Sequence, residues 1–391
     1  MTTEAKKPRA WRSLLKSFLL SLPIVLASPV MMGGGPQLPR DRLSLIALLA
    51  TIVFANATFF LIIHTGKTDH YRAIFFVVMA FCFIIGFMTN LLEKRGSLAL
   101  TAEDMASGNT PMCHIVIPMT IVPAALTRTI IFPGSILGGF ADIASMFVIW
   151  IGFTLALGRG FCSWGCFFGG LDDFFSRLRK KRTIRDVDKR WTYLPYAVLL
   201  GIILTAAATL SPTYCFWLCP YKAVTEFLAV TSVKIMVQTF IFVLLFIALV
   251  IVLPVLTKRR AQCGLFCPFG AFQSLLSKLC AFDIRVRPDR CKEKCRLCTQ
   301  ECPSFAINRE SIDRGGTRLS CSLCGKCVDI CPHDAVCYHV KGTPVAARPR
   351  LARVLYLYPA FLFLSTFGGG MIAGGLHRIL LLATTGSMFM R

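Results

Sequence analysis

Residues 291–332 read CKEKCRLCTQECPSFAINRESIDRGGTRLSCSLCGKCVDICP, with two cysteine runs separated by a short spacer. The runs are Cys291-x3-Cys295-x2-Cys298-x3-Cys302-Pro303 and Cys321-x2-Cys324-x2-Cys327-x3-Cys331-Pro332. The second run has the spacing of bacterial iron–sulfur ligands, C-x2-C-x2-C-x3-C-P, and the first has one additional residue between its first two cysteines. The stretch therefore predicts a bacterial-type ferredoxin module with two [4Fe–4S] clusters.

The ligand sets follow from the paired runs, because the fourth cysteine of each run binds the cluster of the other run. One cluster is assigned to Cys291, Cys295, Cys298 and Cys331, and the other to Cys321, Cys324, Cys327 and Cys302. Structural zinc is the alternative. Zinc needs four ligands per site and does not require a third cysteine plus C-P in each run, so we favour clusters.

The composition indicates a membrane protein. Of 391 residues, 55% are hydrophobic and 16% are charged, and the mean hydropathy of +0.64 is too high for a soluble chain of this length. The formal charge of +23 does not indicate nucleic-acid binding, because Lys and Arg lie in short blocks between apolar stretches. Cluster ligands are reduced thiolates, so the cysteine-rich segment is expected in the cytoplasm.

Seven apolar stretches are long enough to cross a bilayer as helices. The first follows a basic N-terminal segment and resembles an uncleaved signal anchor. The seven are 14–32, 43–64, 73–92, 136–157, 191–210, 236–256 and 354–374. The stretch 375–390 is short and contains His377 and Arg378, which predicts an eighth partial span or an interfacial helix.

The expected fold class is mainly α, a polytopic transmembrane protein of about seven or eight spans with an inserted α+β ferredoxin module. Four regions are predicted: 1–135 with about three spans, 136–280 as a transmembrane core, 281–345 as the ferredoxin domain, and 346–391 as a C-terminal transmembrane segment. The segment 93–135 is apolar and rich in proline. That composition is typical of a re-entrant or surface-lying piece.

Basic residues set the expected orientation, because Lys and Arg accumulate in cytoplasmic loops. With the N-terminus inside, counting the spans places the basic loop 177–190 and the segment 258–353 inside, in agreement with their charge. Lys258, Arg259 and Arg260 are read as part of this orientation signal. The sequence therefore predicts a multi-pass protein of the bacterial inner membrane with a cytoplasmic ferredoxin.

A repeated C-x3-C motif precedes the ferredoxin. Two copies read FCSWGCFFG at 161–169 and QCGLFCPFG at 262–270, and a third, CFWLCPY at 215–221, lies between them. One span separates successive copies, so Cys162/Cys166 and Cys263/Cys267 are expected at the cytoplasmic face and Cys215/Cys219 at the outer face. Cysteines four residues apart on a helix lie on one side, about one turn apart. We hypothesise that the two cytoplasmic pairs converge as four thiolates on one further metal centre.

Other interpretations of these pairs stay open at this point. Cysteine can serve as a small apolar residue, with Gly and Pro marking helix ends. Three copies in aromatic surroundings favour a redox or metal role. For Cys215/Cys219 the alternatives are a disulfide, a copper site and a docking site for a partner.

Four further cysteines outside these motifs are interpreted as follows. Cys82 lies inside a span and is expected to pack. Cys280 and Cys337 flank the ferredoxin and are expected to be core thiols. Cys113 beside His114 resembles a ligand pair, but adjacent helical residues point in different directions.

Isolated polar residues near the spans receive separate interpretations. Asp142 is the one acidic residue well inside a predicted span, and because such carboxylates are costly it is predicted to accept a proton at a quinol site toward the outer side. His64 and His377 either contact haem or quinone or are simply hydrogen-bonded. Asp172 and Asp173 are expected to balance the basic loop that follows them.

With C-x3-C pairs at the ends of membrane helices ahead of a two-cluster ferredoxin, residues 136–339 resemble the membrane polyferredoxin family of NapH-, NosR- and CcoG-like proteins. The resemblance carries over to Cys162/Cys166, Cys263/Cys267 and the eight ferredoxin cysteines. It also implies electron transfer involving a quinol pool. The chain departs from the pattern in three respects: Phe167 replaces the usual Pro of the first pair, Cys215/Cys219 is an additional pair, and extra spans lie at both ends.

These observations together predict a membrane-bound electron relay between a quinol or cytoplasmic donor and a redox partner, which we expect to be periplasmic. The protein would then be an electron-transfer component, such as a quinol dehydrogenase subunit, with two [4Fe–4S] clusters and a further cluster or soft metal at the C-x3-C pairs. The rival is a maturation factor whose clusters reduce a metal such as copper. A redox sensor is weaker, because no output domain is recognisable.

Overall fold

The computed structural model describes residues 14–32, 39–94, 113–128, 143–184, 187–225, 232–292, 295–345 and 348–389. Within these residues, seven helices are long and apolar enough to cross a membrane: Leu14–Met32, Arg42–Thr65, Thr68–Thr89, Phe147–Trp164, Lys189–Thr209, Val233–Thr257 and Pro349–Thr385. Each predicted span has a counterpart among them. The chain is therefore a mainly helical multi-pass protein, and the expected fold class is confirmed.

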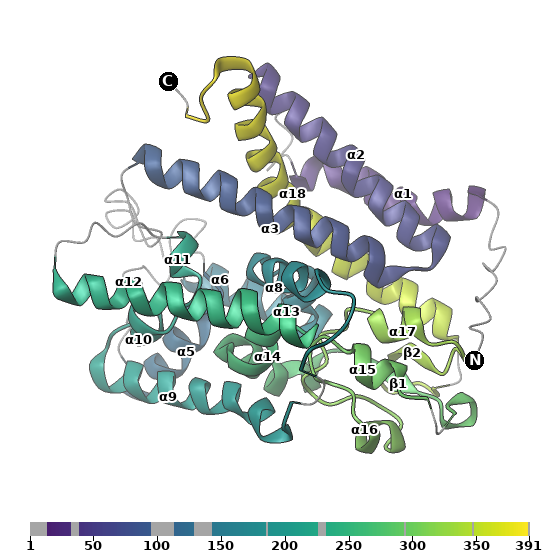
Figure 1. Cartoon of the computed structure of the whole chain (residues 1–391). Coiled ribbons are helices and arrows are strands. Elements are labelled where there is room, and N and C mark those ends of the chain that lie inside the picture. Colours follow the sequence, from purple (N-terminus) through teal and green to yellow (C-terminus); the bar gives the residue numbers. More distant parts are fainter. Residues whose placement is uncertain are drawn as a thin grey trace.

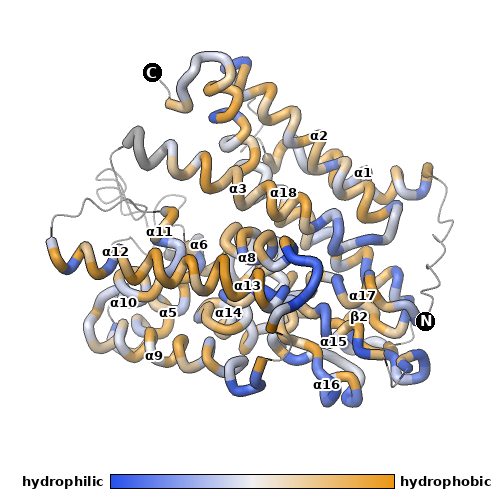
Figure 2. The backbone as a smooth tube through the Cα atoms, in the orientation of Figure 1, coloured by the Kyte–Doolittle hydropathy of each residue, from blue (hydrophilic) through white to orange (hydrophobic). Residues whose placement is uncertain are grey.

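The long helices pack in two groups (Figure 1). One group contains α1 (Leu14–Met32), α2 (Arg42–Thr65), α3 (Thr68–Lys94) and α18 (Pro349–Thr385). The other contains α8 (Phe167–Arg177), α9 (Leu194–Thr209), α12 (Val233–Leu245), α13 (Leu253–Thr257) and α14 (Pro268–Leu276). The two groups meet where α8 packs on α3, and α6 (Ile143–Leu157) packs against α18. Between α12 and α13, the segment Phe246–Val252 is π-helical. The ferredoxin segment lies at one end of the molecule, where hydrophilic residues gather in Figure 2.

The C-terminal helix α18 packs tightly against α3. A Cβ atom on Gly375 would lie 2.5 Å from the carbonyl oxygen of Cys82. The close approach of the two backbones therefore requires glycine at this position. Arg378 is buried, and its Nη1 donates to the carbonyl of Met388 over 2.9 Å. The separate eighth element predicted for 375–390 is wrong, since this packing lets α18 continue through His377 to Thr385.

A short apolar helix, α5 (Val116–Thr127), occupies part of the segment predicted to be re-entrant or surface-lying. It packs against α9 and α14, and its first five residues are buried. The surface-lying alternative is therefore wrong for α5, because its apolar residues are covered by these neighbours. Residues 95–112 and 129–142, including Asp142, lie outside the described residues.

The ferredoxin segment is closed by a two-stranded antiparallel sheet. Strand β1 (Phe282–Val286) pairs with β2 (Val336–Val340), with Phe282 opposite Val340. Three short helices lie between them: α15 (Leu297–Glu301), α16 (Arg309–Asp313) and α17 (Lys326–Ile330). The pairing brings the two ends of the segment together directly after α14 and before α18.

A buried charge network joins α3 to α8 beside the ferredoxin. Arg72 contacts Asp69 at 2.7 Å and Asp173 at 3.2 Å, and Arg177 contacts Asp69 at 2.8 Å. The backbone N–H of Asp69 donates to Asp329 of α17 over 2.6 Å. Asp173 also pairs with Arg177, the first residue of the basic loop, at 3.2 Å, so it balances that loop in part and is paired with Arg72 inside the protein as well. Removing one partner of such a buried ion pair strongly destabilises a protein, because the other charge stays buried without compensation.

Candidate functional site

The ferredoxin cysteines form two groups of neighbouring thiols. In the first, burial raises the pKa of Cys298 to about 11, and three nearby thiols raise it further: those of Cys291, Cys331 and Cys295. In the second, burial raises the pKa of Cys321 to about 12, helped by Cys302 and Cys324, and Cys327 completes the group. We name these four-residue sets the first and second thiol groups. The grouping of neighbours follows the ligand sets expected from the spacing, and the binding of one cluster by each group stays a prediction.

The two exchanged cysteines share one local geometry. Cys302 has φ −65° and ψ 117°, and Cys331 has φ −70° and ψ 113°. Each Sγ accepts a hydrogen bond of 3.3 Å from the backbone N–H four residues later, Ala306 or Ala335. Hydrogen bonds to cluster-ligating sulfurs are one of the ways in which proteins set a reduction potential.

The cysteine pairs of the first and last C-x3-C copies converge. Burial raises the pKa of Cys166, and the nearby thiols of Cys162 and Cys267 raise it further. The pKa of Cys263 is raised by burial and, among other groups, by Cys166 and Cys267. The four residues, which we name the third thiol group, are therefore neighbours, and a metal centre shared by all four stays a hypothesis.

The third thiol group repeats the local geometry of the ferredoxin cysteines. Cys166 has φ −80° and ψ 107°, and Cys267 has φ −65° and ψ 116°, close to the values at Cys302 and Cys331. Each precedes a helix, α8 or α14, and backbone N–H groups two and three residues later donate to its sulfur. Cys263 lies in a π-helical turn, Gln262–Phe266, a conformation common at functional sites.

Two buried arginines hold these copies together reciprocally. Arg159 stands three residues before Cys162, and its Nη2 donates to the carbonyl of Cys263 over 2.9 Å. Arg260 stands three residues before Cys263, and its Nη1 donates to the carbonyl of Cys162 over 2.9 Å. The two copies are thus related by an approximate two-fold exchange of identical contacts.

The same arginines reach the loop of the second thiol group. Arg159 Nη1 donates to the carbonyl of Ser320 over 2.8 Å, and Arg260 Nη2 donates to Ser322 Oγ over 2.7 Å. Trp164 Nε1 donates to the carbonyl of Leu323 over 3.2 Å. Arg260 is fully buried and holds these segments together, and its part in the orientation signal stays a prediction. Extending the repeat alignment three residues upstream would have revealed both arginines.

The acidic residue Asp172 belongs to this site as well. It is fully buried, and its Oδ2 accepts the backbone N–H of Cys263 over 2.9 Å. Burial raises its pKa to about 7. The expectation that Asp172 balances a surface loop is therefore wrong, because the helix α8 points it at the neighbouring motif copy.

The third copy of the motif packs against the other two. Tyr221 stacks on Phe168 with ring centroids 3.8 Å apart, and its hydroxyl donates to the carbonyl of Phe168 over 3.1 Å. Tyr214 lies beside Phe266, with ring centroids 6.5 Å apart. The expected separation of Cys215/Cys219 from the other pairs by a full span is wrong, because the motifs fold back into the bundle instead of staying at its ends.

Cys113 and His114 contact different motif copies. Burial raises the pKa of Cys219 to about 12, and the nearby Cys113 thiol raises it further. His114 Nε2 lies 3.4 Å from Cys166 Sγ, and burial lowers its pKa to about 3. The two side chains approach different motif copies, so they do not form one ligand pair. Each is instead a candidate ligand beside a neighbouring cysteine pair.

The donors around the third thiol group fit an iron–sulfur cluster. Arg260 Nε and Gln262 Nε2 are buried without a protein partner, and sulfide or thiolate acceptors would satisfy them. In the part of the chain that is described, no three or more His, Cys, Asp or Glu side chains are arranged for a single metal ion, which holds its thiolates at about 2.3 Å. The two buried donors without a partner are the observation that supports a cluster at this site.

The remaining predicted residues lie apart from these groups. His64 Nδ1 is 3.3 Å from Ser17 Oγ, and His377 Nε2 is 3.4 Å from Asp41 Oδ2. Cys280 is buried near the carbonyl of Ala156, and Cys337 is buried in β2.

Comparison with known proteins concerns the C-x3-C copies. Three segments match the family model described as a 4Fe-4S binding domain: 142–185, 191–236 and 239–287. Each contains one copy of the motif, including the copy around Cys215, and none reaches Cys291. The protein-family match therefore identifies the motif copies, independently of the ferredoxin cysteines, as iron–sulfur sequence.

Several curated proteins are similar in sequence to the chain. An uncharacterised protein of Methanocaldococcus jannaschii is 29% identical, over 51% of the chain and 80% of its own length. The Escherichia coli protein YccM, named for electron transport, is 30% identical over 48% of the chain and 52% of its length. The ferredoxin-type protein NapH of Escherichia coli is 26% identical over 48% of the chain and 64% of its length. The chain is therefore similar to ferredoxin-type electron transport proteins.

The polyferredoxin resemblance inferred from the sequence is thus confirmed, although the chain spans only about half the length of YccM. No solved structure is significantly similar to the chain. The matched segments and these relatives indicate an iron–sulfur protein of the electron-transport kind, and its seven long apolar helices indicate a multi-pass membrane protein.

Proposed function

We propose that this ferredoxin-type protein relays electrons between a quinol or cytoplasmic donor and a redox partner on the outer side of a bacterial inner membrane. The first and second thiol groups would hold two [4Fe–4S] clusters in the cytoplasm. The third thiol group would hold a further iron–sulfur cluster within the helical bundle. When bound, these clusters supply one-electron redox chemistry, and the protein supplies position and potential.

The observation that carries this proposal is the reciprocal contact of Arg159 and Arg260. Each arginine binds the carbonyl of a cysteine in the opposite motif copy and also the loop of the second thiol group. The ferredoxin is therefore tied directly to the membrane motifs at the point where an electron would pass. The first and second thiol groups also lie near each other. Burial raises the pKa of Cys327 most, the thiols of the second group raise it next, and Cys298 of the first group raises it further.

The residues around the third thiol group would set its electrostatics and exclude water. The guanidinium groups of Arg159 and Arg260 place positive charge beside thiolates, which favours the reduced state. Phe161, Phe168 and Phe269 surround the His114 ring, with centroid distances of 5.3, 5.9 and 4.8 Å. This apolar shell keeps the site dry.

The path would continue toward Cys215/Cys219, which lies beside Cys113. Asp142 is retained as a proposed proton acceptor for quinol, at a position outside the described residues. The regions 1–135, 136–280, 281–345 and 346–391 are proposed as the functional divisions of the chain.

A two-step reduction experiment tests the relay. A soluble quinol analogue is added to the anaerobic purified protein, and bleaching of cluster absorbance is followed; Cu(II) is then added. Rapid bleaching by quinol, with slow Cu(II) reoxidation that is unchanged in Cys215→Ser, is the expected result. No bleaching by quinol together with fast, Cys215-dependent Cu(II) reduction would favour the metal-reducing maturation factor instead.

A further inference from the structure

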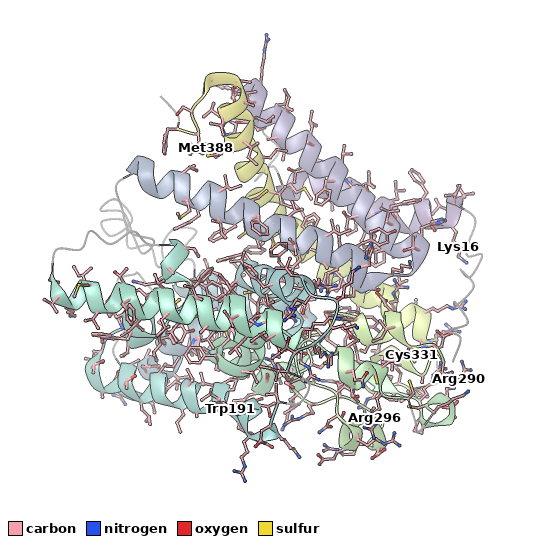
Figure 3. All side chains as sticks on the ribbon, in the orientation of Figure 1. Lys16, Trp191, Arg290, Arg296, Cys331 and Met388 are labelled. Atoms are coloured by element: carbon pink, nitrogen blue, oxygen red, sulfur yellow. The ribbon has the colours of Figure 1, made fainter. Side chains whose placement is uncertain are left out.

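A cavity of about 780 Å³ lies between the ferredoxin segment and the start of α9. Its wall combines the turn before α9, part of α14, and ferredoxin residues around α16 and the loop 316–320. Trp191 stands at this end of α9, on the ferredoxin side of the molecule (Figure 3). Trp191 and Tyr193 are both more than half exposed. Exposed Trp and Tyr at a helix end are typical of the membrane–water interface, so the cavity opens at that level.

The cavity wall is strongly basic. Six lining residues are cationic and one, Glu310, is a carboxylate; the cations are Arg159, Lys189, Lys278, Arg285, Arg314 and Arg318. Glu310 pairs with Lys189 at 3.0 Å and with Arg314 at 3.5 Å. Arg285 pairs with Asp283 at 2.8 Å. The lining therefore carries an excess of positive charge.

Three of the cations form no ion pair with a carboxylate among the described residues: Arg159, Lys278 and Arg318. Arg159 is only 3% exposed, and its Nε has no hydrogen-bond partner. Arg318 donates to Thr192 Oγ1 over 3.3 Å and lies 5.8 Å from the Tyr193 ring centroid, which holds it against the α9 wall. Crowded like charges are unfavourable unless an anion lies between them.

We infer that this cavity binds a phosphate-bearing anion, supplied by the headgroup of an acidic phospholipid or by a phosphorylated soluble molecule. Arginine forks match phosphate oxygens in geometry and charge, and basic pockets at the cytoplasmic ends of membrane helices suit acidic lipid headgroups. Leu275 and Leu319 also line the cavity and are 51% and 44% exposed. They provide an apolar rim along which an acyl chain can lie.

The test uses the full-length protein in a neutral detergent. Two probes are titrated, mixed micelles containing phosphatidylglycerol and inorganic phosphate, and binding is measured as ligand-dependent thermal stabilisation. Micelles containing phosphatidylcholine serve as the reference. The double variant Arg318→Gln/Lys278→Gln is expected to weaken phosphatidylglycerol binding about ten-fold or more. Each Lys or Arg near an anionic lipid surface adds to the binding affinity, and this variant removes two of them.

A matched control is the double variant Arg179→Gln/Lys181→Gln. It removes the same charge outside the cavity, and Arg179 donates to a threonine hydroxyl, Thr183 Oγ1, as Arg318 does to Thr192. Its binding is expected to equal that of the unmodified chain. A second, independent variant is Glu310→Gln, which removes the lining carboxylate and is expected to tighten binding about three-fold.

The outcomes separate the two sources of phosphate. Phosphatidylglycerol binding that inorganic phosphate does not displace indicates a lipid headgroup, and displacement by inorganic phosphate indicates that a soluble phosphorylated molecule also fits. The inference is overturned if the cavity and control variants lose affinity equally, if phosphatidylcholine binds as well as phosphatidylglycerol, or if Glu310→Gln weakens binding.

Discussion

The motif copies around Cys162 and Cys263 differ from the copy around Cys215 in how they are held. The first two each have an arginine three residues upstream, and each arginine binds the other copy. The third has Pro212 at that position, and proline has neither a side-chain donor nor a backbone N–H. Equal cysteine spacing therefore supports two arrangements, a four-thiol site shared by two copies and a separate pair beside Cys113.

A second difference lies at the position after the motif aromatic. Gly169 and Gly270 occupy it in the paired copies, and a Cβ there would lie 2.6 Å from the carbonyl of Cys162 or 3.0 Å from that of Cys263. Lys222 occupies it in the third copy. The helix after each paired copy thus packs directly onto its own cysteine turn, and the third copy has no need of that close approach.

The largest expected effect is that of removing one thiol from the four-thiol site. Cys263→Ser should lower the iron content by about one third, because one of three proposed clusters loses a ligand. Cys215→Ser should leave the iron content unchanged. Iron and acid-labile sulfide are measured per chain. Cys280→Ser, a buried cysteine outside the groups, is the control, and an equal loss in all three variants would contradict the distinction between the copies.

Arg260→Gln comes next and tests the reciprocal contact. It removes a fully buried charge that binds the third thiol group and the ferredoxin loop, so the free energy of unfolding should fall by about 3–5 kcal/mol. Thermal unfolding in detergent measures it. Lys258→Gln, whose ion pair with Glu301 is partly exposed, should change stability by less than about 1 kcal/mol. A loss of unfolding free energy as small as that of Lys258→Gln would show that the reciprocal contact of Arg260 does not stabilise the fold.

The glycine difference predicts a graded series. Gly169→Ala should destabilise by about 1–3 kcal/mol, because its Cβ meets backbone that cannot move away easily, and Gly270→Ala should cost less. Gly201→Ala in α9 meets nothing within 4 Å and should cost nothing. The three melting temperatures decide the order, and an equal change at Gly169 and Gly201 would show that the close packing is not tight.

The smallest effect is expected where the third copy touches the first. Tyr221→Phe keeps the stack on Phe168 and removes the hydroxyl bond to its carbonyl, at a cost of about 1 kcal/mol. Tyr193→Phe, at an exposed position, is the control. Chemical denaturation of both variants checks the difference. A loss of several kcal/mol for Tyr221→Phe would mean that the third copy is as firmly integrated as the paired copies.

Much of the fold could be predicted from the sequence because long apolar stretches have few alternatives to membrane helices. Five of the seven spans recur within about five residues at both ends, and the stretches beginning at 136 and 354 differ by more. The thiol groupings also followed from spacing. The length of α18 did not, because hydropathy treats His377 and Arg378 as an interruption, whereas tertiary packing buries Arg378.

The arginine contacts could not be predicted by charge counting. In the sequence, Arg159 and Arg260 look like any other basic residue near the end of a membrane span. Only the packing of the two motif copies against each other shows that both arginines are buried hydrogen-bond donors. The position of the third copy was missed for a related reason. Counting spans assumes that motifs stay at helix ends, and the stacking of Tyr221 on Phe168 shows that these turn inward.

The central claim is that the paired C-x3-C copies hold a cluster of their own, next to the two in the ferredoxin. The most direct test is the iron and acid-labile sulfide content of the anaerobically purified chain, with EPR of the reduced protein. About twelve irons per chain, and an additional signal that disappears in Cys162→Ala, are the predicted results. About eight irons, with a spectrum unchanged in Cys162→Ala, would contradict the claim and confine the redox chain to the ferredoxin.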